Sequence, residues 1–186
     1  ARRRRADLVF AGLCVFTIGC LLYIGRDLTF FYDEWDFILG RRGISTDTLL
    51  GGHNGHLSLI PVAIYKGLLQ LTGIEHYWVF QFVLALVHVA AASMLYVLAR
   101  GRIGATAAVF VALPFLLLGA AFEDLLWAFQ IGFTGAVATG LGALVALDRR
   151  TPRGDLLASL LLLASFGFSS PAIVFTFAVA TELTLR

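Results

Sequence analysis

The sequence predicts an all-α protein, a polytopic bundle of transmembrane helices that forms a single domain over residues 1–186. Hydrophobic residues make up 59% of the chain and charged residues only 14%, and the mean hydropathy is +0.87. A water-soluble domain of this length could not bury so much apolar surface. Several apolar runs are also long enough to cross the roughly 30 Å hydrocarbon core of a bilayer as helices. We therefore expect five or six spans in a cell membrane.

The first span is expected over residues 6–25, an apolar run that follows the four arginines Arg2 to Arg5. Cytoplasmic ends of spans carry an excess of arginine and lysine, so we expect the N-terminus on the cytoplasmic side. The mixed segment that follows, residues 26–76, then forms a long first loop on the outer face of the membrane.

A helix expected over residues 57–71 decides the topology. It is short for a span and contains Pro61 and Lys66, which favours a position along the membrane interface. If it lies there, the later arginine clusters all return to the cytoplasmic side, in agreement with the usual distribution of positive charge. The further spans predicted by this topology are residues 77–98, 103–121 and 125–147.

The last apolar segment, residues 156–185, is too long for one ordinary helix and barely long enough for two. Gly167 and the sequence Ser169-Ser170-Pro171 interrupt it in the middle, and such residues commonly end a helix. We favour two short helices that meet at a turn, and a single kinked, tilted span is the alternative.

Under this topology two groups of polar residues share the outer face, one in the first loop among aromatic side chains and one between the third and fourth spans. Ionised carboxylates at a lipid interface are costly unless water, cations or hydrogen-bond donors accompany them, which suggests a function. The alternative is an interfacial anchor in the loop and ordinary solvated turn residues in the connection. The residues are Asp33, Glu34 and Asp36 in the loop, and Glu123, Asp124, Trp127 and Gln130 in the connection.

Two histidines, His53 and His56, flank an Asn-Gly pair in the first loop. At this spacing both imidazoles can lie on one face of a turn and contact a phosphate, a metal ion or only water. Zinc sites in proteins have a fuller set of ligands, and no cysteine or fixed third ligand accompanies these two. Contact with a phosphate or a sugar is therefore favoured, and a divalent cation stays open.

The order of these motifs resembles the N-terminal half of the GT-C glycosyltransferases, polytopic enzymes that use polyprenyl-phosphate sugars. The resemblance covers most of residues 6–186. Each motif is short, so their order relative to the spans carries the resemblance. The motifs are Tyr32-Asp33-Glu34 after the first span, the turn His53-Asn54-Gly55-His56 before an interfacial helix, and Trp127-Ala-Phe-Gln130-Ile-Gly132-Phe after an acidic turn.

The resemblance implies transfer of a sugar from a polyprenyl phosphate to an acceptor hydroxyl on the outer face of the membrane. Asp33 matches the family's catalytic aspartate and would deprotonate the acceptor as general base, while Glu34 and Asp36 orient the base or the acceptor. A phosphate leaves readily as an anion, so positive charge or donors around its oxygens are expected to assist. Candidates for this contact are Arg41, Arg42, His53 and His56. Candidates for acceptor binding are Glu123, Asp124, Trp127 and Gln130.

GT-C enzymes usually have more spans than the five or six expected here. We therefore expect the remainder of a longer chain, a second subunit, or a reduced relative without activity. The expected partners are a lipid-linked sugar donor, a glycan, lipid or protein acceptor and the membrane, with no nucleic acid, and no cofactor is firmly implied. The alternative function is a non-catalytic membrane subunit or scaffold whose outer acidic loop binds a partner or a cation. A transporter is disfavoured because the acids lie at the rim of the membrane.

Overall fold

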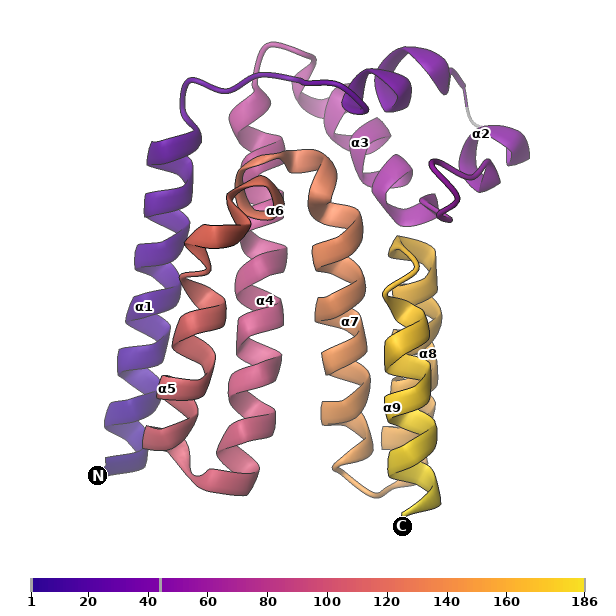
Figure 1. Cartoon of the computed structure of the whole chain (residues 1–186). Helices are drawn as coiled ribbons and strands as arrows, with labels where there is room; N and C mark the ends of the chain where they lie inside the picture. Colours follow the sequence, from indigo (N-terminus) through magenta and orange to yellow (C-terminus); the bar gives the residue numbers. More distant parts are fainter. Residues whose placement is uncertain (1, 44, 186) are drawn as a thin grey trace.

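The computed structural model describes residues 2–43 and 45–185, and this part of the chain folds into a bundle of helices (Figure 1). The prediction of an all-α helical bundle is therefore confirmed. Four helical stretches of the described chain are long and apolar enough to cross a membrane, which indicates a membrane protein. They are Arg3–Gly25, Tyr77–Ile103, Ala105–Leu126 and Ala128–Leu147.

Six helices of the described chain run side by side to form the bundle (Figure 1). They are α1 (Arg2–Gly25), α4 (Tyr77–Ile103), α5 (Ala105–Leu116), α7 (Ile131–Leu147), α8 (Pro152–Phe168) and α9 (Ala172–Thr184). Helices α1, α4 and α5 pack on one another, and α7 packs on α8 and α9. The contact between α4 and α7 joins these two groups into one bundle.

Two helix ends differ from the expected spans because of the local backbone. Helix α4 continues past residue 98 through its arginines and ends only at Gly104, whose φ of 85° lies in the left-handed region that favours glycine. The next span, expected over residues 103–121, is interrupted. Helix α5 ends at Leu116, soon after Pro114, whose ring removes a backbone donor from the helix.

The span expected over residues 125–147 is also divided. A short helix, α6 (Phe122–Leu126), stands before it and ends at Trp127, which adopts an extended conformation with φ −88° and ψ 108°. A 3-10 turn, Ala128–Gln130, then leads into α7. The acidic pair that the sequence places in a turn therefore lies on a helix.

The last apolar segment contains two helices, α8 and α9, which lie against each other as antiparallel neighbours (Figure 1). Helix α8 ends at Ser169, whose backbone is fully extended with φ −173° and ψ 174°. Pro171 then stands at the N-cap of α9, where the fixed φ of proline is compatible with the start of a helix. The Ser-Ser-Pro sequence thus reverses the chain.

The first loop lies at one end of the bundle, here called the loop end (Figure 1). It contains a π-helix (Asp36–Gly40), α2 (Thr46–Leu50) and α3 (Leu59–Thr72). Helix α3, expected to lie along the interface, is placed beyond the end of the α8–α9 pair rather than among the bundle helices (Figure 1).

Aromatic side chains of this loop pack against the bundle. The ring of Phe30 lies edge-on to two rings of α4, with centroid distances of 4.8 Å to Tyr77 and 5.0 Å to Phe80. Phe37 of the π-helix and Tyr65 of α3 complete the same buried cluster, with their ring centroids 5.4 Å apart. Such edge-to-face pairs add to the free energy of apolar burial, so the loop is a packed part of the fold.

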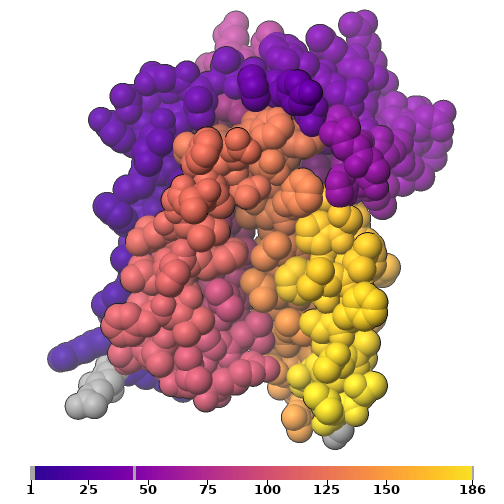
Figure 2. Space-filling model, in the orientation of Figure 1, coloured from indigo at the N-terminus to yellow at the C-terminus, as the bar shows by residue number. Residues whose placement is uncertain are grey.

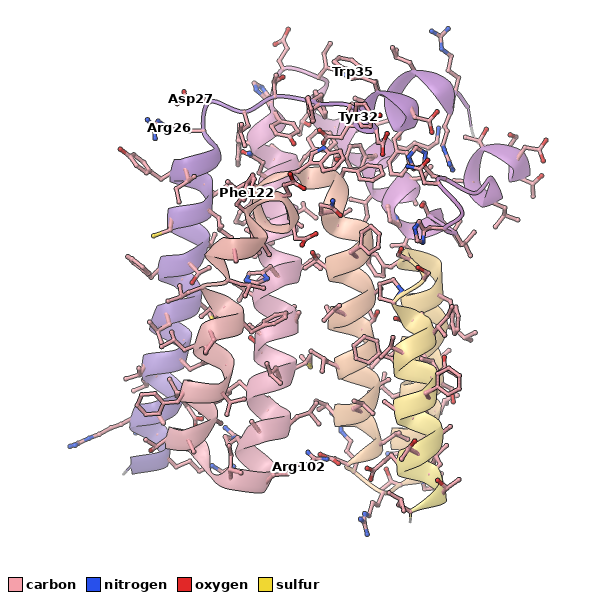
Figure 3. The ribbon with its side chains drawn as sticks, viewed as in Figure 1. Arg26, Asp27, Tyr32, Trp35, Arg102 and Phe122 are labelled. Carbon is pink, nitrogen blue, oxygen red and sulfur yellow. The ribbon has the colours of Figure 1, made fainter. Side chains whose placement is uncertain are left out.

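The opposite end, here called the arginine end, is held by charged pairs between helices. Arg100 of α4 donates to the Asp7 carboxylate of α1 at 2.8 Å, and the Tyr96 hydroxyl donates to the same oxygen at 2.7 Å. Arg102, labelled in Figure 3, makes a two-bond contact of 3.0 and 3.2 Å with Asp148 at the end of α7. Two-bond arginine–carboxylate pairs fix orientation well, so these contacts set how α1 and α7 meet α4.

Glycines of α7 allow α8 and α9 to approach closely, so Gly140→Ala should destabilise the bundle. A Cβ at Gly140 would overlap the ring of Phe175 in α9, and such overpacking costs about 1–3 kcal/mol. Gly19→Ala is the control, because a Cβ at Gly19 meets no atom within 4 Å. Thermal unfolding in detergent micelles should show a lower melting temperature for Gly140→Ala alone. Equal melting temperatures of the two variants would contradict this packing.

Candidate functional site

Glu34 is the buried centre of the loop end, with a side chain that is 0% exposed. Its carboxylate accepts four hydrogen bonds: 2.8 Å from the Phe31 amide, 2.5 Å from the Tyr65 hydroxyl, 3.2 Å from the Tyr77 hydroxyl and 3.1 Å from the Trp127 indole. These donors come from the first loop, α3, α4 and the link between α6 and α7. One carboxylate therefore joins four segments that are distant in the sequence.

Burial and hydrogen bonding act in opposite directions on this acid. Removal from water raises the pKa of Glu34, and the four donors partly oppose that rise because they favour the charged form. The pKa of Tyr65 is raised well above its ordinary value by burial and by the neighbouring Glu34 charge. Glu34 thus meets protein donors rather than solvent, and its contacts suit a group that holds its neighbours in position.

Asp33 points to a different environment from its neighbour Glu34. The preceding residue, Tyr32, has a φ of 47° in the left-handed region, which costs of the order of 1–3 kcal/mol for a residue other than glycine. The Asp33 side chain is 22% exposed. One of its oxygens accepts a 3.1 Å hydrogen bond from the Asn54 amide and lies 3.4 Å from Nε2 of His53. Asp33 is therefore partly accessible, and the Asn54 amide holds its position.

The two histidines sit on a tight turn. Asn54 and Gly55 both have positive φ, 49° and 79°, as a type I′ turn requires. The backbones of His53 and His56 exchange two hydrogen bonds of 2.9 Å. Nδ1 of His53 lies 3.0 Å from the Asp36 carboxylate, so this imidazole stands between Asp33 and Asp36. Nδ1 of His56 lies 2.7 Å from the Ser170 hydroxyl, between α8 and α9.

Arg41, a candidate for phosphate contact, is engaged within the chain. Its guanidinium donates to the backbone carbonyls of Thr48, Gly51 and Gly52 and lies 3.5 Å from the Asp36 carboxylate. Arg41 is also largely buried. Its donors are therefore used to shape the first loop.

Arg42 lies apart from Asp33. It lines a separate cavity of about 270 Å³ together with Lys66 and Gln70. The amine of Lys66 donates to the carbonyls of Arg41 and Gly43. Of the four residues predicted to contact a phosphate, the structure brings His53 and His56 to the cavity that Asp33 lines and places the two arginines elsewhere.

Two cavities meet at Asp33 and Trp127, which line both of them. The larger, about 660 Å³, is mostly apolar, and its walls include Tyr32 and Phe122, both labelled at the loop end in Figure 3. The smaller, about 170 Å³, has a mixed lining of aromatic and polar side chains. Its polar residues are Asp33, His53, Asn54, His56, Ser58, Gln130 and Ser169. A mostly apolar cavity and a cavity with many polar groups thus share one carboxylate.

The predicted acceptor-binding residues divide between three cavities. Glu123 lines the large apolar cavity, and Trp127 stands in the wall between the large and small cavities. Gln130 lines the small cavity, and its Oε1 atom is buried without a hydrogen-bond partner in the described chain. Asp124 lines a third cavity, inside the bundle. The structure therefore separates the two adjacent acids of α6.

Several residues of the site have no signal in the sequence. Tyr65 and Tyr77 look like ordinary aromatic residues of amphipathic helices, and only the fold brings their hydroxyls to Glu34. Ser170 lies in a helix turn 114 residues from its partner, His56. Asn54 is the exception, because an Asn-Gly pair predicts a turn and so places this amide beside the histidines.

No known protein family, curated protein or solved structure matches this chain. Among residues 2–43 and 45–185, no three histidine, cysteine, aspartate or glutamate side chains are grouped as metal ligands.

Replacement of Glu34 should show how strongly its hydrogen bonds hold the loop to the bundle. Glu34→Ala leaves four donors without their acceptor, of which the hydroxyls of Tyr65 and Tyr77 are buried, and this should lower the free energy of unfolding by about 3 kcal/mol or more. Glu34→Gln is the matched control, because its amide keeps one acceptor and the Tyr65 hydroxyl can accept from the new N–H. Thermal unfolding in micelles should show a much larger loss for alanine. Similar losses in both variants would mean that charge, rather than hydrogen bonding, decides.

Proposed function

We propose that this chain acts as a membrane glycosyltransferase that moves a sugar from a polyprenyl-phosphate donor to an acceptor hydroxyl on the outer face of the membrane. The observation that carries the proposal is the position of Asp33 between a mostly apolar cavity and a smaller one of mixed lining that holds seven polar side chains, here called the polar cavity. A lipid-linked sugar has the same division, a long apolar chain joined to a polar head. The reacting bond of such a donor lies at the junction of its two parts.

The surroundings of Asp33 suit a general base. Its carboxylate is partly accessible, and the Asn54 amide holds it in position. In the proposed reaction Asp33 takes the proton of the acceptor hydroxyl as the acceptor oxygen bonds to the anomeric carbon. The bond between that carbon and the phosphate oxygen breaks, and the phosphate leaves with the electron pair. The other carboxylates have supporting parts: Asp36 orients His53, and Glu34 orients Trp127.

The departing phosphate needs hydrogen-bond donors. The donors of Arg41 already bind backbone carbonyls. Both ring nitrogens of His53 also have partners, Asp36 and Asn54, so the proposal gives this role first to His56, which lines the same cavity as His53. On the acceptor side, Gln130 offers an amide oxygen without a partner, and Trp127 offers a ring held by Glu34.

The alternative, a non-catalytic subunit or scaffold, has one observation in its favour. Each of the three acids predicted to act in the first loop has a partner within the chain: Asp33 with Asn54, Glu34 with its four donors, and Asp36 with His53. Such pairing is also what a purely structural loop would have. The two functions differ in the effect of removing the Asp33 carboxylate without disturbing the fold.

Asp33→Asn should abolish sugar transfer, because an amide cannot take the acceptor's proton. Loss of a general base typically lowers the rate by about 10²–10⁴-fold. The measurement is transfer of radiolabelled sugar from a panel of polyprenyl-phosphate sugars by the membrane-inserted protein. Asp27→Asn is the control, because that side chain is 84% exposed and pairs with its neighbour Arg26. Wild-type turnover by a folded Asp33→Asn protein would remove the proposed base and favour the scaffold.

The apolar cavity should set the affinity for the lipid part of the donor. Thr29 lines it, and Thr29→Trp would fill part of its volume. The KM for a long-chain polyprenyl donor should rise by roughly tenfold, through lost apolar contact, while a short-chain, water-soluble donor analogue is used as before. Leu71→Trp, at an 82% exposed position of α3, should change neither. Equal effects on long and short donors would show that the chain binds elsewhere.

A further inference from the structure

A third cavity, of about 260 Å³, lies inside the bundle between α4, α5, α6, α7 and the start of α9. It has Phe133 in common with the small polar cavity, and the rest of its lining is different. Most of its walls are aromatic or aliphatic. Three polar side chains, His88, Asp124 and Thr134, interrupt the apolar lining. The chemistry of these three residues defines what the cavity can bind.

Two of the three have no partner within the described chain. The Asp124 carboxylate makes no hydrogen bond or ion pair there, and neither does the hydroxyl of Thr134, although that residue is only 8% exposed. Asp124 is an exposed residue, so its carboxylate can be reached from outside the bundle, whereas Thr134 is buried and its hydroxyl lies in the cavity wall. Both groups are therefore available to accept hydrogen bonds from a bound molecule.

The third polar group is also an acceptor. Nε2 of His88 lies 3.0 Å from the Leu116 carbonyl, which can only accept, so Nε2 carries the proton. In the neutral ring Nδ1 is then left as an acceptor. His88 is only 2% exposed and stacks on Phe115, with ring centroids 5.4 Å apart. The cavity thus combines three acceptors, one of them anionic, with the rings of Phe115 and Phe133.

We propose that this cavity binds a primary ammonium group. An ammonium has three N–H donors and no acceptor, which matches a carboxylate, a hydroxyl and an imidazole nitrogen. Its positive charge pairs with Asp124, and aromatic rings such as those of Phe115 and Phe133 attract cations. A hydroxyl ligand would supply one donor and no charge, so it could not pair electrostatically with Asp124 and donate to the imidazole at the same time.

The route of access points to a ligand that arrives from the membrane. Helix α5 packs on α1 and α4, whereas α9 packs on α7 and α8. Figure 2 shows a furrow between α5 and α9 on this face of the molecule. In this proposal the ammonium group of a phospholipid headgroup enters from this furrow, and a free amine would supply the same chemistry from water.

Lipid binding to the purified protein in detergent, measured by native mass spectrometry, tests the proposal. Phosphatidylethanolamine should bind at least about tenfold more tightly than phosphatidylcholine, whose quaternary nitrogen has no N–H donor. Asp124→Asn should remove that preference, and Thr134→Val should reduce it about threefold. Free ethanolamine distinguishes the two sources: competition at millimolar concentration means that the amine alone suffices, and no competition means that the lipid is required.

Two matched controls make the result specific. Glu123→Gln removes one charge from the neighbouring residue of α6, which lines a different cavity, and Thr139→Val removes a hydroxyl of α7 that already donates to the Gly135 carbonyl. Both should retain the preference for phosphatidylethanolamine. Equal binding of the two lipids, an unchanged preference in Asp124→Asn, or an equal loss in Glu123→Gln would each overturn the proposal. None of these outcomes depends on sugar transfer.

Discussion

The hydrogen bonds that converge on Glu34 are the constraint on which the loop end depends. A carboxylate taken out of water is expensive, and it becomes tolerable only when donors surround it. Here the donors come from the loop itself, from α3, from α4 and from the link between α6 and α7. Any displacement of one segment would leave a buried acid or a buried donor unpaired, so the four segments are held in a single arrangement.

That arrangement explains how neighbouring acids acquire different environments. Because Glu34 is fixed in the core and Tyr32 turns the backbone through the left-handed region, Asp33 is directed to the cavities beside it. The Trp127 indole donates a hydrogen bond to the same carboxylate, and this bond fixes the orientation of the ring. Trp127 also forms the wall that the two cavities share. Glu34 therefore positions the wall at which the two cavities meet, and its neighbour Asp33 lies at that junction.

The sequence predicts those features that depend on local chemistry. Apolar runs of the length of a bilayer gave the principal helices, Ser169-Ser170-Pro171 gave the break between α8 and α9, and Asn54-Gly55 gave the turn between the histidines. The break at Trp127 was not predicted, because an aromatic residue carries no helix-stop signal and its extended backbone accompanies a tertiary contact with Glu34. The engagement of Arg41 with backbone carbonyls depends equally on the folded loop.

The division between Glu123 and Asp124 follows from helix geometry. It shows that two adjacent residues of a sequence motif need not act at the same site. Consecutive residues of an α-helix project about 100° apart, because one turn contains 3.6 residues. An acidic pair in a flexible turn could act together, but on α6 Glu123 lines the apolar cavity shared with Asp33 and Asp124, also exposed, lines a different cavity. Helix α6 therefore separates two chemical environments, and a change in its rotation would alter both at once.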